Sequence, residues 1–284
     1  MAINLKTLAE ASALSSSNAR NHSILIYGDA KTGKTRFVGT VAKIPEIKRV
    51  FWVDLENGIE TLLHMDLAPA ELEKIIPICI PDTREVPRGI ETVLKMFSSK
   101  TPISICQEHG TVNCQLCSKA GLEAIPFCLK DCTSSDLIVI DSGSQLGDSA
   151  LAFACAGRDI TFKPTFDEWG AQGKYLGDIM GVIQAAHFTN FVVITHSLVV
   201  EEVINGIKTD KVYPLIGTRA FSQKVGKYFG TVIYMEKKLG KHAAGSSSLY
   251  KTNTLTGSRL NIAIEKSKEL DMRSILVEGG IIKC

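Results

Sequence analysis

The residues from Gly28 to Thr35 read GDAKTGKT and fit the pattern G-x-x-x-x-G-K-[ST] at every fixed position. The glycines let the main chain curl so that successive N–H groups point inward, and such a cradle binds phosphate. Lys34 is expected to reach the β- and γ-phosphates of ATP, and the Thr35 hydroxyl to ligate Mg²⁺. The alternative, an ordinary glycine-rich turn, is disfavoured by the apolar run before the motif and the helical stretch after it. The predicted nucleotide-binding residues are Gly28, Asp29, Ala30, Lys31, Thr32, Gly33, Lys34 and Thr35.

A carboxylate from a neighbouring strand should complete the magnesium site. Asp141 ends the apolar run DLIVID, and ligands of open α/β sheets gather at the carboxyl ends of strands. We therefore predict Asp141 as the second Mg²⁺ ligand. Helix capping is the alternative role for an aspartate at this place.

The elements that must position these residues are short apolar runs that alternate with helical stretches. Uninterrupted β-branched runs suit strands buried on both faces, as in a parallel sheet covered by helices. The alternation predicts an α/β fold with a mostly parallel central sheet flanked by helices. The predicted strands are 23–28, 49–54, 75–80, 136–141, 190–195 and 231–236, with helices over 34–42 and 170–186.

Two further segments read as hairpins rather than as strand–helix units. Residues 198–213 form two β-like runs around Asn205-Gly206, which is a strong signal for a tight turn. Near the end of the chain, a second hairpin is predicted to turn near Thr256-Gly257.

Five of the eight cysteines fall between Cys106 and Cys132. The N-terminus lacks the layout of a secretory signal, so a disulfide framework is not expected. Cys106, His109, Cys114 and Cys117 form two close pairs that could hold a structural Zn²⁺, with Cys128 and Cys132 as substitutes. Because the segment is short and polar, metal binding would supply its folding energy. Free surface thiols or a redox pair are the alternatives.

Composition excludes several classes of protein. The 284 residues are 45% hydrophobic and 22% charged, which is typical of a soluble globular protein, and the longest apolar runs are too short for a membrane helix. A cytoplasmic protein without membrane partners is expected. The net charge is only +2, yet residues 204–268 hold twelve Lys or Arg against three Asp or Glu. This stretch predicts a face that binds a polyanion, with a solvated surface as the alternative.

The phosphate loop, Asp141, the segment D-x-E-x-G at Asp54, Glu56 and Gly58, and the strand-end His196 together resemble RecA-like P-loop ATPases. The resemblance extends over about residues 20–265 and is closest to small phage AAA/RecA-type proteins of single-strand annealing and recombination. It implies a RecA-like ATPase domain over 21–268 with a cysteine-rich insertion at 99–133. Residues 1–20 would form an N-terminal helix and linker, and 269–284 a C-terminal tail.

The resemblance also implies roles for two polar side chains beside the phosphate loop. Glu56 would activate the attacking water, with Asp54 as its rival, and helix capping or a lysine partner is the alternative for Glu56. His196 would sense the γ-phosphate, although the bacterial recombinase has an amide side chain there. A structural histidine that bonds backbone groups is the alternative.

Basic side chains after His196 are implied to contact DNA or a neighbouring subunit. Lys208 and Lys211 lie on the predicted hairpin that corresponds to a DNA-contacting loop of RecA-like proteins. Arg219 and Lys224 are the candidates for a basic finger that reaches the site of an adjacent subunit. Surface charge without a partner is the alternative for each.

A second loop, after the fourth predicted strand, carries Arg158, Lys163 and Trp169, and these residues could also meet DNA.

These residues favour an ATP-dependent, single-stranded-DNA-binding ATPase of annealing or recombination, acting in the host cytoplasm if the chain is phage-encoded. The protein would assemble head to tail as a ring or filament, and a single-strand-binding protein is a further candidate partner. A nucleotide-switch adaptor or loader that recruits protein partners in DNA replication is the alternative function. A small-molecule kinase is less favoured, because no acceptor site or lid is recognisable.

Overall fold

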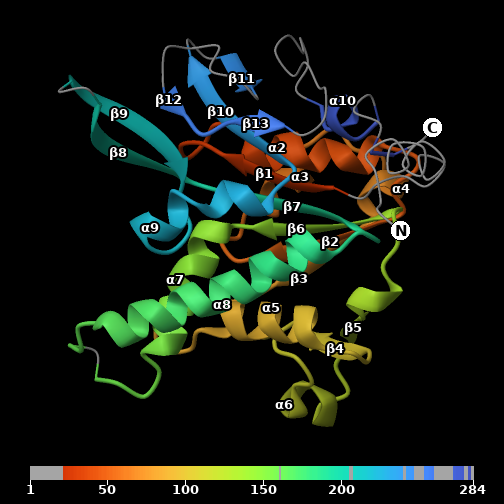
Figure 1. Ribbon diagram of the computed structural model, residues 1–284. Coiled ribbons are helices and arrows are strands. Elements are labelled where there is room, and N and C mark those ends of the chain that lie inside the picture. The colour runs from red at the N-terminus through yellow and green to blue at the C-terminus, as the bar shows by residue number, and fades with distance from the viewer. Residues whose placement is uncertain are drawn as a thin grey trace, which may run out of the picture.

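The computed structural model describes residues 22–159, 161–204, 207–238, 241–245, 253–258, 271–277 and 281–282 (Figure 1). Its central sheet contains β1 (Ser23–Tyr27), β2 (Arg49–Asp54), β3 (Ile75–Cys79), β6 (Asp136–Asp141), β7 (Asn190–Thr195), β10 (Thr231–Lys238), β11 (Lys241–Gly245) and β13 (Gly257–Ser258). The order is β11-β10-β1-β7-β6-β2-β3, with β13 also beside β10. The six strands from β10 to β3 run parallel, and β11 and β13 run antiparallel to β10. The predicted α/β fold and its six strands are confirmed.

Both faces of this sheet are buried, which explains the unbroken apolar runs. Alternate side chains of β1 enter different cores: Leu25 and Tyr27 pack on one face, and Ile24 and Ile26 on the other. Every residue of β6 and β7 is buried. The sheet therefore separates two hydrophobic layers, as expected for a parallel sheet covered by helices.

Helices cover the two faces unequally (Figure 1). The first face is covered by α5 (Arg88–Ser98), α7 (Gly143–Ala154) and α8 (Phe166–Ala185). The second face is covered by shorter elements, namely α2 (Lys34–Gly39), the 3₁₀ turn η1 (Thr40–Lys43), α3 (Glu60–Leu63) and α10 (Arg273–Leu276). The remaining helical segments are α4 (Pro69–Leu72), α6 (Gln115–Lys119), η2 (Leu129–Asp131), α9 (Arg219–Ser222) and η3 (Val225–Tyr228). None of the described helices has the length and apolarity needed to cross a bilayer.

The first predicted hairpin is present, whereas the described part of the second, residues 253–258, does not pair with itself. Strands β8 (Ser197–Ile204) and β9 (Ile207–Pro214) pair antiparallel around the predicted turn and extend away from the sheet (Figure 1). Near Thr256-Gly257, β12 (Asn253–Thr254) instead pairs with β9, whereas β13 pairs with β10. Within residues 253–258 the two short strands therefore join different sheets and do not pair with each other, and the rest of the predicted hairpin lies outside the described residues.

The cysteine-rich insertion contributes to the main core, although its sequence looked too polar to do so. Its strands β4 (Ile103–Cys106) and β5 (Ala124–Phe127) pair antiparallel. The side chains of Ile105 and Phe127 are buried in the first core cluster, and the Phe127 ring meets Phe51 edge-on at 5.1 Å. Folding energy in this segment therefore comes in part from apolar burial.

Of the two predicted terminal segments, the structure describes part of the C-terminal one and none of the N-terminal one. The expected helix and linker over 1–20 lie outside the described residues. In the expected tail, Met272, Ile275 and Leu276 are fully buried in the second core cluster, together with Ile281 and Ile282. The core of the domain thus extends beyond residue 268.

An ion pair links the starts of β2 and β6. Arg49 and Asp136 are register partners, with Nε–Oδ1 at 2.8 Å and a second contact from the guanidinium to Oδ2 at 3.0 Å. Burial opposes ionisation of Asp136, but hydrogen bonds from Arg49 and Thr133 hold the pKa of Asp136 below its usual range. A carboxylate with a lowered pKa stabilises the folded state above pH ~4 and loses this effect as the pH falls through the folded-state pKa.

Replacement of Arg49 by Met should therefore lower the free energy of unfolding by about 2 kcal/mol at pH 7, because a buried carboxylate loses its charged donor. Urea denaturation over a pH series measures this. The difference in free energy of unfolding between wild type and R49M should be constant around neutral pH. It should become smaller below pH ~4, where Asp136 becomes protonated. Lys48→Met, on the adjacent exposed lysine, is the control; a loss in R49M that does not change with pH contradicts the prediction.

Candidate nucleotide-binding and hydrolysis site

The phosphate loop joins β1 to α2, as the motif requires. A Cβ at Gly28 would lie 2.0 Å from the Met235 carbonyl oxygen, so only glycine allows this approach to β10. Gly33, at the N-cap of α2, has a φ of 87°, which is a left-handed conformation that favours glycine. The local backbone thus requires glycine at both positions, as the phosphate-loop interpretation predicts.

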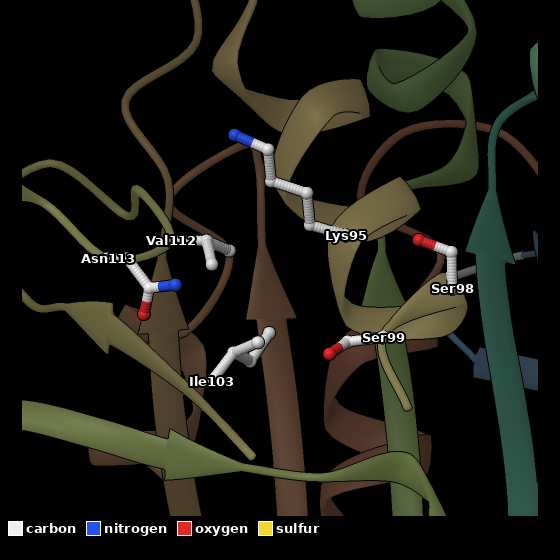
Figure 2. A pocket seen from close by; sticks show the side chains of 6 residues that line it. All are labelled: Lys95, Ser98, Ser99, Ile103, Val112 and Asn113. Atoms are coloured by element: carbon white, nitrogen blue, oxygen red, sulfur yellow. The ribbon is translucent and has the colours of Figure 1, made fainter. Parts of the chain in front are cut away.

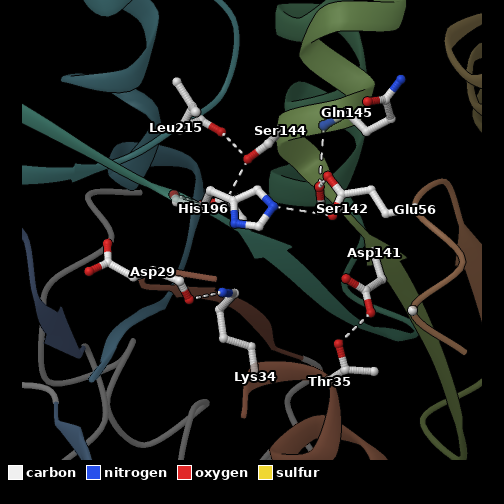
Figure 3. Close-up of polar contacts among 12 residues, drawn as sticks. Asp29, Lys34, Thr35, Glu56, Asp141, Ser142, Ser144, Gln145, His196 and Leu215 are labelled. Atoms are coloured by element: carbon white, nitrogen blue, oxygen red, sulfur yellow. Dashed lines mark hydrogen bonds and ion pairs between the residues drawn. The ribbon is translucent and has the colours of Figure 1, made fainter. Parts of the chain in front are cut away.

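Lys34 lies inside the loop that it is predicted to serve (Figure 3). It is 7% exposed, and its Nζ donates hydrogen bonds to the carbonyl oxygens of Gly28 at 2.9 Å and Asp29 at 2.7 Å. Burial lowers the pKa of Lys34, while the nearby carboxylates of Asp141, Glu56 and Asp29 act in the opposite direction. A phosphate that enters the loop would find the ammonium group already held at the cradle.

Thr35 and Asp141 meet where the magnesium site is predicted. The Thr35 hydroxyl donates to Asp141 Oδ2 at 2.9 Å, and Asp141 is 4% exposed. Burial raises the pKa of Asp141 to about 7, and the charges of Asp54 and Glu56 add to the effect. A hydroxyl and a carboxylate oxygen side by side fit Mg²⁺, which prefers hard oxygen ligands.

Asp54, the rival for the catalytic role, has a structural one. Its carboxylate accepts hydrogen bonds from the backbone N–H groups of Glu56 at 3.2 Å, Gly58 at 2.9 Å and Ile59 at 3.0 Å. Asp54 is 2% exposed, so these donors hold a buried charge and shape the loop after β2. The same loop brings Gly58 against Asp141: a Cβ at Gly58 would lie 3.0 Å from Asp141 Oδ2.

Glu56 lies at the centre of a short polar network (Figure 3). Its two carboxylate oxygens accept hydrogen bonds from Ser142 Oγ at 2.5 Å and from His196 Nε2 at 3.2 Å. Burial acts to raise the pKa of Glu56, but these hydrogen bonds and the charge of Lys34 outweigh it and lower the pKa below its ordinary value. Glu56 is therefore ionised at neutral pH and able to accept a proton.

The end of β7 connects this network to the phosphate loop. The backbone N–H of His196 donates to Ser144 Oγ at 2.9 Å. The next residue, Ser197, donates a hydrogen bond from its hydroxyl to the Asp29 carboxylate and begins the β8–β9 hairpin. The roles of Ser142, Ser144 and Ser197 were not predicted, because serines beside strand ends are common and only the fold brings them to Glu56, His196 and Asp29 respectively.

The two lysines of the β8–β9 hairpin are each paired with a glutamate of the facing strand. Lys208 pairs with Glu201 at 3.0 Å, and Lys211 pairs with Glu202 at 2.7 Å across the hairpin. Both glutamates precede the stretch whose charge was counted, so the hairpin is closer to neutral than the sequence indicated. Arg219, the first residue of α9, and Lys224, the N-cap of η3, are both exposed. Residues 259–268 of the predicted basic stretch lie outside the described residues.

The predicted zinc ligands do come together in the insertion. Ligand atoms of Cys106, His109, Cys114 and Cys117 all lie within 4.8 Å of one another. His109 Nδ1 is 3.2 Å from Cys117 Sγ and 3.8 Å from each of the other two sulfurs. Tetrahedral Zn²⁺ with Zn–S bonds of about 2.3 Å requires separations of about 3.8 Å, so the donors fit that ion.

The two substitute ligands lie elsewhere. Cys128 and Cys132 are absent from the group of metal-competent side chains found among the described residues. Burial raises the pKa of Cys132 to about 12, and the charge of Asp136 acts in the same direction. The expectation that either cysteine could replace a ligand is therefore wrong for this arrangement.

Residues 20–259 match the model of the family described as AAA domain. No curated protein matches the sequence.

Several solved structures are similar to this chain. An ATPase of the type III secretion system of pathogenic bacteria is 11% identical, with a TM-score of 0.46 over 77% of this chain and 52% of that one. The RadB recombinase is 16% identical, with a TM-score of 0.38 over 80% of each chain. The flagellar accessory protein FlaH of Methanocaldococcus jannaschii is 11% identical, with a TM-score of 0.37 over 80% of this chain and 78% of that one. This chain thus spans about half the length of the secretion ATPase.

Gly58→Ala should weaken Mg²⁺-dependent nucleotide binding about tenfold, because the added methyl group would press on the Asp141 carboxylate. Overpacking of this kind costs about 1–3 kcal/mol, and about 1.4 kcal/mol corresponds to a tenfold change in affinity. Titration with a non-hydrolysable ATP analogue, with and without Mg²⁺, measures this. Gly173→Ala is the matched control, since a Cβ there meets nothing within 4 Å. An equal loss of affinity in the absence of Mg²⁺ would show that the methyl group disturbs the loop rather than the metal site.

Proposed function

This chain belongs to the AAA domain family, and from that premise we propose that it hydrolyses ATP and couples hydrolysis to the binding of single-stranded DNA. The observation that carries the proposal is the position of three consecutive residues. Thr195 ends β7, His196 bonds Glu56, and Ser197 bonds Asp29 of the phosphate loop and begins the hairpin. One short segment therefore touches both the hydrolytic carboxylate and the phosphate cradle.

Hydrolysis is assigned to residues at the carboxyl edge of the sheet. Lys34 and the backbone N–H groups of the loop bind the phosphates, and ionised Glu56 accepts a proton from the attacking water. Mg²⁺ held by Thr35 and Asp141 would neutralise charge that develops on the phosphates. Asp54 positions the loop that carries Glu56 and does not touch the reacting atoms.

Nucleotide binding would change the contacts that the free site makes. Lys34 Nζ is satisfied by two loop carbonyls, and Glu56 by Ser142 and His196. A γ-phosphate beside Lys34 competes for these groups, so His196 and Ser197 respond to its presence. The β8–β9 hairpin starts at Ser197 and follows any movement of this segment.

The hairpin is the proposed DNA contact. Lys208 is 73% exposed, and an exposed ion pair such as the one with Glu201 contributes only ~0–1 kcal/mol, so a phosphate of DNA can replace the glutamate. Lys211 is less available, because Glu202 also bonds Tyr213. Tyr213 is 9% exposed and is packed in the protein, so charge rather than stacking on this ring supports the interaction.

Self-assembly is proposed on the basis of two exposed basic side chains that follow the β8–β9 hairpin. Arg219 and Lys224 make no ion pair among the described residues, and each is available to a neighbouring subunit. A head-to-tail ring or filament would bring such a finger to the adjacent phosphate loop. Annealing or recombination, with a single-strand-binding protein as a partner, is the process that fits an ATP-controlled hairpin of this kind.

Structural Zn²⁺ is proposed for the insertion. The four donors leave no open coordination position, which favours a structural rather than a catalytic ion. The ion would join the β4–β5 pair to α6, whose Cys117 is buried, while apolar residues such as Ile105 secure the strands to the main core.

Single-stranded DNA should raise the ATPase rate, and Lys34→Ala should abolish both the basal and the stimulated rate by removing the phosphate ligand. Glu56→Gln should bind ATP and DNA normally while its turnover falls by a factor of about 100 or more, because the base is lost. ATPase rate against DNA concentration measures both effects. Glu60→Gln, an exposed residue one turn further on, is the matched control.

Three outcomes would contradict the proposal. Equal ATPase rates with and without single strands, together with no shift of a labelled oligonucleotide at low salt, exclude the DNA role. Turnover that survives in Glu56→Gln excludes Glu56 as the base. DNA affinity that does not fall as salt rises would also exclude binding through lysines and phosphates.

The purified chain should contain one zinc ion, and Cys117→Ser should lose it and melt at a lower temperature, because metal binding contributes folding free energy. Elemental analysis after gel filtration and thermal denaturation measure the two effects. Cys128→Ser is the control and should keep the ion, since Cys128 lies outside the cluster. Zinc retained by C117S, or absent from the wild type, would overturn the site.

A further inference from the structure

A hollow of about 520 Å³ lies between α7, the start of α8 and the loop after β3. This volume is in the usual range for a small-molecule site. A second hollow, of about 280 Å³, lies between α5 and the insertion (Figure 2) and has a lining of Lys95, Ser98, Ser99, Ile103, Val112 and Asn113. The smaller one has no aromatic side chain, and its Lys95 is paired with Glu91 at 2.6 Å. The larger hollow is therefore the better candidate for a ligand.

Aromatic rings line one side of the larger hollow. Trp169 is 39% exposed, and a capping box in which the Glu168 carboxylate accepts from the Thr165 backbone N–H at 2.8 Å fixes the first turn of α8 that carries it. Phe162 also lines the hollow, and the Arg158 guanidinium lies 5.1 Å from the centre of its ring. An indole held in place and left open to solvent is a platform on which a planar ligand can stack.

Two carboxylates on the opposite side differ in their partners. Asp82 accepts hydrogen bonds from the Gly89 backbone N–H at 2.9 Å, Ser149 Oγ at 3.1 Å and Gln145 Nε2 at 3.3 Å. Asp148 has no hydrogen bond or ion pair within the part of the chain that the structure describes. Asp148 is exposed, but the protein around it partly desolvates its carboxylate and so raises its pKa, and the charges of Glu56 and Asp82 act in the same direction. Asp148 is thus the acceptor that a ligand N–H group would satisfy.

A positive charge beside the hollow indicates that the ligand also carries an anionic group. Lys163 lines the hollow and is exposed, without an ion-pair partner among residues 22–159 and 161–204. A ligand that satisfies every part has a flat ring for Trp169, an amino group for Asp148 and an anionic group for Lys163. Nucleotides of cytosine, adenine and guanine combine these features, whereas thymine lacks the amino group.

We propose that this hollow binds an amine-bearing nucleobase, which stacks on Trp169 and donates its exocyclic amino group to Asp148, with its phosphate at Lys163. Where the base belongs to a DNA strand, the inference rests on the proposed function; a free nucleotide would supply the same chemistry. Base binding here also reaches the hydrolytic site. Ser142 caps α7 by accepting from the Gln145 N–H at 3.2 Å and donates to Glu56, and the same helix presents Asp148.

Tryptophan fluorescence tests the inference directly, because Trp169 is one of two tryptophans and the other, Trp52, is fully buried. The probes are oligo(dC) and oligo(dT) of equal length, dCMP and dTMP, each added to the full chain without any adenine nucleotide, because adenine would compete for the same hollow. Oligo(dC) should quench Trp169 and bind about tenfold more tightly than oligo(dT), since a donor to a carboxylate is gained.

Asp148→Ala should bring the affinities for oligo(dC) and oligo(dT) together, while Asp178→Ala, an exposed aspartate of α8, should keep the preference. Trp169→Phe should remove the quenching and retain most of the preference. A change in base preference separates recognition from a structural role, which would weaken both oligonucleotides alike. Asp148 is exposed to solvent, and thermal denaturation verifies that its variant folds.

The outcomes separate this inference from the proposed function. Quenching by oligo(dC) alone assigns the base to a strand, and quenching by dCMP as well admits a free nucleotide; both support the hollow. Equal binding of oligo(dC) and oligo(dT) without quenching, in wild type and D148A, overturns the hollow and leaves the DNA-binding proposal intact. Quenching by dCMP without binding of either oligonucleotide supports the hollow and removes the DNA role. No response to any probe overturns both.

Discussion

Two buried carboxylates side by side constrain the whole site. Asp54 and Asp141 are register partners at the ends of β2 and β6, and each is less than 5% exposed. Backbone N–H groups satisfy Asp54, so its charge is tolerated. Asp141 has the Thr35 hydroxyl beside it and a pKa raised to about 7 by burial. This edge of the sheet is therefore built to receive a cation, and the phosphate loop places Lys34 beside it.

The parts of this arrangement that could be predicted are those encoded locally. A strand buried on both faces needs an unbroken apolar run, so the six parallel strands could be predicted from the sequence with bounds close to those observed. The phosphate loop was equally legible, because its glycines are needed for approach to β10 and for a left-handed turn. The cysteine cluster followed from spacing alone, since ligands close in sequence need little help from the fold.

Contacts between distant segments were not predictable in the same way. Glu56 and His196 are 140 residues apart, and only the order β7-β6-β2 brings their strand ends to one edge. Lys211 was assigned to DNA because its hairpin corresponds to a DNA-contacting loop of the family that the sequence resembles, but the pairing of β8 with β9 places its ammonium group 2.7 Å from Glu202. The apolar contribution of Ile105 was missed because a four-residue strand gives too short a pattern to separate from a loop.

The energies of the contacts around Glu56 suit a switch rather than a rigid structure. Each hydrogen bond to a charged group contributes about 1.5–3 kcal/mol at most when well shielded, and Glu56 and His196 are partly exposed, which reduces that figure. The bonds from His196 and Ser142 to Glu56, with the one from Ser197 to Asp29, therefore sum to a few kcal/mol. Coupling free energies between sites in proteins are typically 1–3 kcal/mol. Under the proposed function, a phosphate that redirects these bonds would thus change the positions of the hairpin and of α7 without unfolding either. A network of much higher free energy would not respond to the phosphate.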